Sequence, residues 1–230
     1  MRTKTDRVDA AVIARFCLER KPRAWTPPTP EVEALQALAR RLDALDKMIS
    51  QERNRLETTS SELVEDIKAH LEFLKQQRKS LLEKINHHIE CHDTLNHQRD
   101  LITSIPGLGD KTAAIILAEI GDIHFFKSAR QLAAHAGLTP KAHESGSSIH
   151  KKPRLSKMGN ARLRKALYMP ALASINHNPV IAQFRDRLLG AGKLKMQVVG
   201  AIMHKLIRWV FGVLHSGQPF DANKALAVHT

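Results

Sequence analysis

The chain has 230 residues, enough for one large domain or two small ones, and its 36 Lys and Arg against 23 Asp and Glu give a formal charge of +13. Such a surplus favours a polyanionic partner, nucleic acid first and an anionic membrane surface second, over a merely soluble basic protein. The two cysteines are far apart in sequence and do not suggest a disulfide framework, which fits a reducing cytoplasm, and no uncharged run is long enough for a membrane span.

A helix is predicted over residues 5–20, because Val8, Val12 and Phe16 follow helical spacing. No apolar run precedes it, so no signal peptide is expected. Asp6 and Asp9 stand three apart on one face and could share a Mg²⁺ ion. Acids also favour the first turn of any helix through its dipole, and spacing alone favours this simpler explanation. A proline-rich extended linker follows.

Two long helices are expected next, up to about residue 92. Thr29 and Pro30 suit the start of the first helix, and residues 59–62 (Thr-Ser-Ser-Glu) resemble a capping box at the start of the second. Apolar residues recur at steps of three and four, as in a coiled coil. They are Leu35, Leu38, Leu42, Leu45, Ile49 and Leu56, then Leu63, Ile67, Leu71, Leu74, Leu81, Ile85 and Ile89. This pattern predicts an antiparallel hairpin or a kinked rod, and either could pair with a second subunit.

The segment from Ile102 to Leu117 resembles a helix-hairpin-helix. Gly107 and Gly109 allow a tight turn and a close approach to a ligand, and the next helix begins near Asp110. Its free N–H groups, with Lys111 beside them, could bind a DNA phosphate. The alternative is a plain helical turn whose glycines serve packing only.

Residues 141–165 hold eight basic residues and a single acid, Glu144. One charge sign so concentrated favours a phosphate-binding surface over a solvated face. The basic residues are Lys141, Lys151, Lys152, Arg154, Lys157, Arg162, Arg164 and Lys165. Residues 139–158 are predicted to form a loop, with at most a short strand. From spacing alone, Ser145-Gly146 within it is ordinary turn chemistry, since a serine nucleophile needs a base or a metal.

Short helices are expected over 128–136, 159–175, 178–189 and 194–215, with a frayed tail after Gly217. His88 and His92 are four apart and could ligate zinc, but no second ligand pair is near, so a polar patch is favoured. The predicted fold is therefore all-α or mostly α, with a long helical hairpin or coiled coil before a compact helical domain that contains the helix-hairpin-helix.

Several motifs together resemble the DEDD-type insertion-sequence transposases, the IS110 family. Residues 3–10 (Thr-Lys-Thr-Asp-Arg-Val-Asp-Ala) look like the end of that family's RuvC-like nuclease domain. Residues 105–109, 137–140, 145–146 and 155–164 resemble, in order and spacing, its second transposase domain. The resemblance covers nearly the whole chain and divides it into a nuclease remnant (1–24), linker and coiled-coil helices (25–93), the C-terminal transposase domain (94–217) and a tail (218–230).

This resemblance implies a function in a bacterial cytoplasm. Asp6 and Asp9 match the last two acids of an Asp-Glu-Asp-Asp set that binds Mg²⁺, and Ser145 matches a nucleophilic serine, with Ser147, Ser148 and Ser156 as alternatives. The implied reaction is cleavage and rejoining of double-stranded DNA at element ends and target through a phosphoserine link, with no nucleotide cofactor. A structured guide RNA, homo-oligomers joined through the coiled coil, and no membrane partner are also implied.

The sequence departs from the family pattern in one respect. The first Asp and the Glu of the set lie on strands upstream of the Asp-x-x-Asp helix, and this sequence has neither. A truncated reading frame, an excised fragment and a misassigned start would each explain the difference, and we expect a chain that binds nucleic acid but does not cut alone. A non-catalytic DNA-binding and dimerisation module is the alternative function. A purely structural coiled-coil protein is disfavoured by the charge of residues 141–165.

Overall fold

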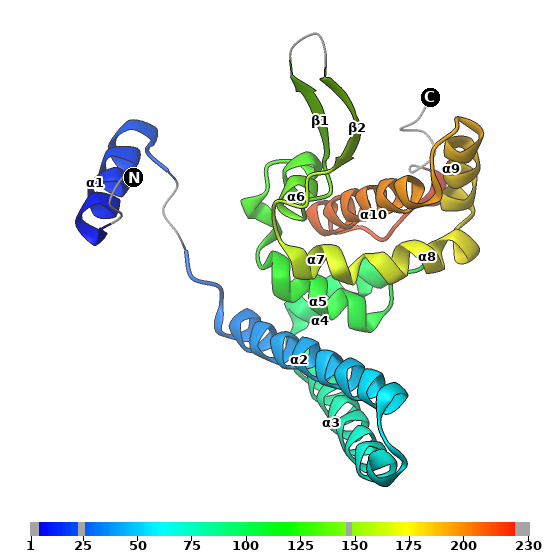
Figure 1. Ribbon diagram of the computed structural model, residues 1–230. Helices are drawn as coiled ribbons and strands as arrows, with labels where there is room; N and C mark the ends of the chain where they lie inside the picture. Colours follow the sequence, from blue (N-terminus) through cyan, green and yellow to red (C-terminus); the bar gives the residue numbers. More distant parts are fainter. Residues whose placement is uncertain (1–4, 23–25, 146–148, 224–230) are drawn as a thin grey trace.

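A computed structural model describes residues 5–22, 26–145 and 149–223, and the side chains of residues 141–154 lie outside the description. The fold is mostly α, as predicted (Figure 1). The helices are α1 (Asp6–Arg20), α2 (Pro30–Thr58), α3 (Val64–Glu90), α4 (Asp93–Thr103), α5 (Asp110–Ile120), α6 (Ala129–His135), α7 (Ala161–Ala166), α8 (Tyr168–His177), α9 (Pro179–Gly190) and α10 (Lys195–Ser216). Short 3₁₀ turns, η1 (Ser61–Leu63) and η2 (Ile123–Phe125), precede α3 and α6, and two strands, β1 (Pro140–Ser145) and β2 (Ile149–Leu155), lie between α6 and α7.

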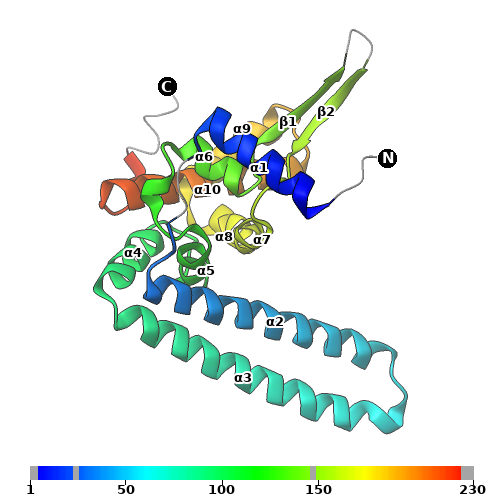
Figure 2. The same cartoon turned by 90° about the vertical axis from the view of Figure 1, so that its left-hand side faces the viewer.

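Helices α2 and α3 form an antiparallel hairpin that extends away from the other helices (Figure 2). Of the two predicted arrangements, the structure has the hairpin and not the rod. The apolar stripes face each other, so Leu42 and Ile85 are each only 1% exposed. The predicted capping box is wrong: the N-cap is Ser60 and not Thr59, Ser60 makes no side-chain capping hydrogen bond, and the 3₁₀ turn η1 leads into α3. Pairing with a second subunit stays a prediction.

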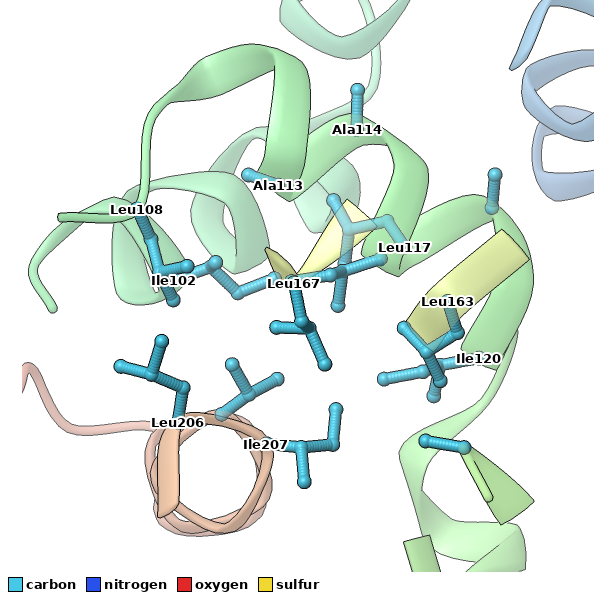
Figure 3. Packing of buried hydrophobic residues seen from close by; sticks show 14 of the residues in the cluster. Ile102, Leu108, Ala113, Ala114, Leu117, Ile120, Leu163, Leu167, Leu206 and Ile207 are labelled. Atoms are coloured by element: carbon cyan, nitrogen blue, oxygen red, sulfur yellow. The ribbon is translucent and has the colours of Figure 1, made fainter. Parts of the chain in front are cut away.

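Helix α10 is the centre of the compact helical body and packs against α4, α6, α8 and α9. Leu206 and Ile207 point from α10 toward Ile102 of α4 and Leu167, both fully buried (Figure 3). By length and composition α10 could cross a membrane, yet most of its apolar window is buried inside the protein. The long apolar helix is therefore accounted for by core packing.

A two-stranded antiparallel hairpin stands where the sequence predicts a loop. β1 pairs with β2 from Pro140 opposite Leu155 to Ser145 opposite Ile149, with an irregularity between Lys141 and His143. This β-hairpin projects from the helical body (Figure 1). Sequence patterns do not predict this β-hairpin, because strongly basic strands lack the alternating apolar pattern that marks a half-buried strand.

The two ends of the chain differ in how they pack. α1 stands apart from the helical body (Figure 1), and none of its residues is buried. The prediction of a frayed tail is wrong for residues 218–223. The Phe220 N–H donates to Ser104 Oγ at 2.8 Å, and the Phe220 ring lies against Trp209 with centroids 4.7 Å apart. This contact anchors the segment after α10 to the body.

Candidate nucleic-acid interface

The β-hairpin carries the residues that the sequence nominated for chemistry. Ser145 is the last residue of β1, at the far end from the helical body. Ser147 and Ser148 lie outside the described residues. Lys151, Lys152 and Arg154 belong to β2, and their side chains lie outside the description. The backbone thus places Ser145 and three basic residues on one projecting element.

The base of the β-hairpin is locked to the helical body by two glycine turns. Gly137, after α6, has φ +67°, and Gly159, before α7, has φ +129°. A Cβ at Gly159 would lie 2.3 Å from the His135 carbonyl oxygen, so only glycine fits. Asn160 caps α7 by accepting hydrogen bonds from the Arg162 and Leu163 N–H groups. The turns give the β-hairpin a rigid base.

Ser156 lies at this base, not at the tip. Its N–H donates to the Thr139 carbonyl at 2.9 Å, and its Oγ accepts a hydrogen bond from the Met158 N–H. Lys157 follows with φ +55° and is exposed. Ser145 and Ser156 are therefore at opposite ends of the β-hairpin, and of these two serines only Ser145 lies at the end far from the helical body.

The turn between α4 and α5 has the predicted glycines, and they have different surroundings. A Cβ at Gly107 would lie 2.8 Å from the Ser174 Cβ of α8, which gives Gly107 a packing role. Gly109 is exposed at the N-cap of α5 with no atom near its missing Cβ. The N-terminus of α5 is thus open to solvent, as phosphate contact requires, while the packing alternative holds for Gly107.

Lys111 is held by the long helical hairpin. Its Nζ donates to Asp46 Oδ2 of α2 at 2.8 Å, and Arg78 Nε of α3 donates to Asp46 Oδ1 at 2.6 Å. Burial works to raise the pKa of Asp46, but hydrogen bonds from Lys111 and Arg78 outweigh it and keep that pKa below its usual value. In the absence of DNA, the ammonium group of Lys111 is therefore already paired with the Asp46 carboxylate.

The basic residues of α7 also have partners. Arg164 donates to the Ala136 carbonyl at 3.0 Å, and Lys165 Nζ lies 2.8 Å from Asp43 of α2. Arg162 is 3.8 Å from Glu119 of α5 and half exposed. In the helical part of the basic stretch, Arg162 and Lys165 thus face acids distant in sequence, whereas Arg164 bonds a backbone carbonyl. Asp43 and Asp46 were not singled out from the sequence, although they flank the buried seam positions Leu42 and Leu45.

Asp6 and Asp9 lie in the first turn of α1, where Asp6 is exposed and Asp9 partly so. Among the described residues, no group of three or more His, Cys, Asp and Glu side chains could hold a metal ion. Two carboxylates on one exposed turn are too few to enclose Mg²⁺, which also needs water or phosphate oxygens. The described residues do not make a complete metal site, and no step through a metal follows from them.

The histidines near residue 90 serve structure. His88 Nε2 is 2.8 Å from the Glu31 carbonyl oxygen across the helical hairpin, and His92 Nδ1 is 2.6 Å from the His88 carbonyl oxygen. Each of these ring nitrogens thus bonds a backbone oxygen, which agrees with the polar patch favoured from the sequence.

One cationic feature was missed from the sequence. α10 carries His204, Lys205 and Arg208, which the sequence shows only as interruptions of an apolar run. They line a groove of about 1260 Å³ between α9, α10 and the base of the β-hairpin. A sequence signal exists: Lys205 has no acid within one helical turn, and Arg208 and Trp209 follow three and four positions later.

Comparison with known proteins agrees with the transposase motifs. The family described as transposase IS116/IS110/IS902 matches residues 99–186, from α4 to α9 and including the β-hairpin. A DEDD transposase family of the IS110 type matches residues 1–65, which contain Asp6 and Asp9. The two matches cover the elements on which the sequence resemblance rests.

Curated relatives extend the likeness along the chain. A pilin gene-inverting protein of Moraxella bovis is 36% identical over 222 residues, which are 96% of this chain and 69% of that protein. An uncharacterized protein of insertion element IS110 from Streptomyces coelicolor is 31% identical over 72% of this chain and 40% of its own length. The transposase of IS1111A from Coxiella burnetii is 42% identical over 36% of this chain and 22% of its own length. The chain belongs to the IS110 family of insertion-sequence transposases.

Proposed function

We propose that this chain is the part of an insertion-sequence transposase that engages double-stranded DNA and carries the nucleophile, Ser145. The observation that carries the proposal is the position of Ser145 at the end of a projecting β-hairpin whose second strand is basic. A projecting basic element can enter a DNA groove, where lysines and arginines hold the phosphates. The transposase family supplies the DNA partner.

In the proposed reaction the Ser145 Oγ attacks a DNA phosphorus and loses its proton to a base. The bond from phosphorus to the DNA O3′ breaks, and the departing oxygen takes up a proton. A free 3′ hydroxyl later attacks the phosphoserine, which rejoins the strand and returns the serine. Basic residues of the β-hairpin, Lys151, Lys152 and Arg154, would stabilise the charge that develops on the phosphate. The link conserves energy, so no nucleotide cofactor is required.

The other family expectations are part of the same proposal. We propose that Asp6 and Asp9 contribute two ligands to a Mg²⁺ site, that a guide RNA selects the DNA, and that the α2–α3 hairpin joins copies of the chain. Gly109, Lys157 and Arg162, all exposed, would contact phosphates around the β-hairpin. The gene inversion named for the Moraxella bovis relative is the kind of rearrangement that we infer for this protein.

For the 230-residue chain alone, we propose DNA binding without cleavage. The supporting observation is that the described residues offer two carboxylates and no third metal ligand near them. The alternative function, a DNA-binding and dimerisation module, rests on this same observation. Turnover of a DNA junction by the chain alone would contradict both.

The test is capture of a covalent protein–DNA adduct on DNA that carries the ends of the element, with guide RNA and Mg²⁺. Two proteins are compared, the 230-residue chain and a form extended by an upstream segment with the two further acids. Each is made with Ser145→Ala and, as a matched control at the base of the β-hairpin, Ser156→Ala. Loss of the adduct in Ser145→Ala alone supports the nucleophile. Loss in Ser156→Ala alone, or an adduct that survives both changes, refutes it. No adduct from either protein, with salt-dependent DNA binding intact, favours the binding module.

A further inference from the structure

The groove beside α10 has a buried cation on its floor. Lys205 is 7% exposed and lines the groove. Its Nζ lies over the Phe184 ring at 4.6 Å and over the Trp209 ring at 5.2 Å from the centroids. In the described part of the chain, no carboxylate forms an ion pair with it, unlike Lys111 and Lys165. A buried charge without an anion is costly unless a ligand supplies one.

The surroundings of Lys205 add positive charge. Burial, then the nearby Arg187 and Arg208, lowers the pKa of Lys205 to about 8. Burial and Arg208 also lower the pKa of His204. Lys157 and Lys193 line the same groove, and Asp221 is the one acid among its described lining residues. The electrostatic potential of the groove therefore favours an anion.

Aromatic side chains gather in the same place. The chain has ten aromatic residues, and four of them, Phe184, Trp209, Phe211 and Phe220, line this groove. Nucleic-acid bases pack on aromatic faces, and their phosphates bind cations. A groove with both features has the chemistry of a nucleotide site.

We propose that the α9–α10 groove binds an unpaired nucleotide of a single-stranded nucleic acid, with a phosphate on Lys205 and Arg208 and a base against its aromatic wall. This inference rests on the proposed function, which it deepens by naming a strand site apart from Ser145. The groove reaches Pro140, Leu155 and Lys157 at the base of the β-hairpin. A strand separated at the β-hairpin could therefore continue directly into it.

The shape of the site favours a single strand over a duplex. Lys205 lies on the floor of the groove between apolar walls, so a ligand must enter to reach it. The bases of a duplex are stacked and paired inside its two backbones and cannot enter in this way. An unpaired strand exposes both a phosphate and a base face. An acidic peptide would supply the negative charge, but its carboxylates would not pack on the aromatic wall as a nucleic-acid base does.

The test measures binding of the full 230-residue chain to labelled oligo(dT), oligo(U) and a duplex. Lys205→Met keeps an apolar stem in the core and removes the charge. We expect it to weaken single-strand binding about ten-fold and to change duplex binding less than about two-fold. Lys195→Met is the matched control, because Lys195 lies on the same helix, exposed and outside the groove. Arg208 is exposed, so Arg208→Gln leaves the core intact, and we expect this variant to lose single-strand affinity as well.

A second signal comes from Trp209. In a Trp25→Phe protein, Trp209 is the single remaining tryptophan, and a strand bound in the groove should quench its emission. The tighter of oligo(dT) and oligo(U) then identifies DNA or RNA as the source of the strand. Equal single-strand affinity in Lys205→Met and Lys195→Met would overturn the inference. An equal loss of affinity for the single strand and for the duplex in Lys205→Met would also overturn it.

The remaining outcomes separate the two proposals. Duplex binding with no single-strand binding overturns the groove site and leaves the proposed function in place. Binding to no nucleic acid at all overturns both. Displacement of Trp209 quenching by poly-glutamate, with no quenching by either oligonucleotide, would assign the groove to an acidic protein and overturn the nucleotide site.

Discussion

The cations on two sides of the helical body differ in whether they are paired with an anion. On the side that faces α2, Lys111 and Lys165 each bond a carboxylate of that helix, and Arg164 bonds a backbone carbonyl. On the side that faces α9, Lys205 is more deeply buried, its Nζ lies over two aromatic rings, and it forms no ion pair with a described carboxylate. The first set holds the structure together, whereas Lys205 is left with charge to offer a ligand. Removing a cation should therefore have different consequences on the two sides.

The largest effect should come from the turn that positions the α7 cations. In Gly159→Ala, the added Cβ meets the His135 carbonyl oxygen at a backbone φ of +129°. We expect a loss of at least about 3 kcal/mol in the free energy of unfolding, because both backbones must move. Chemical denaturation measures it. The control is Gly190→Ala at the end of α9, where nothing lies near the new Cβ, and its stability should be unchanged or slightly higher. Equal stability of the two variants would show that the turn is not rigid.

Arg164→Ala should have the next largest effect, about 2 kcal/mol of unfolding free energy, because it removes a charge-assisted hydrogen bond to the carbonyl of the buried Ala136. Arg162→Ala is the matched control, since Arg162 is half exposed and only 3.8 Å from Glu119. It should cost less than about 0.5 kcal/mol and mainly weaken DNA binding. If Arg164→Ala weakened DNA binding without loss of stability, Arg164 would belong with the ligand-binding cations instead.

Asp46→Asn should release Lys111 and Arg78 at a cost of about 1 kcal/mol of unfolding free energy at neutral pH. Because the pKa of Asp46 is lower in the folded protein, its contribution is present above the unfolded pKa and is lost as pH falls through the folded one. The stability difference between wild type and variant should therefore shrink toward pH 3. Duplex affinity should rise about two-fold as Lys111 becomes available. Glu83→Gln, exposed within α3, should change neither quantity, and an Asp46→Asn variant no tighter than this control would show that Lys111 does not reach DNA.

The sequence predicted the elements of this fold better than the partners of its charges. Local patterns sufficed for the α2–α3 seam, where Leu42 and Leu45 recur at helical steps, and for Pro30 at the start of α2. The β-hairpin was not predicted, because strands made of basic residues do not show an alternation of apolar and polar positions in the sequence. The partners of Lys111 and Lys165 lie 65 and 122 residues away, and no periodicity links them. A run of one charge sign therefore indicated a polyanion surface without telling which of its members are already neutralised.

The smallest predicted effect tests Lys205 itself. Lys205→Met should raise the unfolding free energy at pH 7 by up to roughly 1 kcal/mol, or about 3 °C in Tm, because a desolvated charge becomes an apolar side chain. With a folded pKa of about 8, below the usual value for lysine, the destabilisation by the charge is fully present below pH 8. It fades as pH rises from 8 toward the unfolded pKa, since the folded protein loses the proton first. The Tm advantage of Lys205→Met should thus shrink between pH 8 and pH 10, while Lys195→Met shows no such trend. An advantage that is independent of pH would mean that the pKa of Lys205 is not lowered in the folded protein, and that the gain comes from the apolar methionine side chain and not from removal of a desolvated charge.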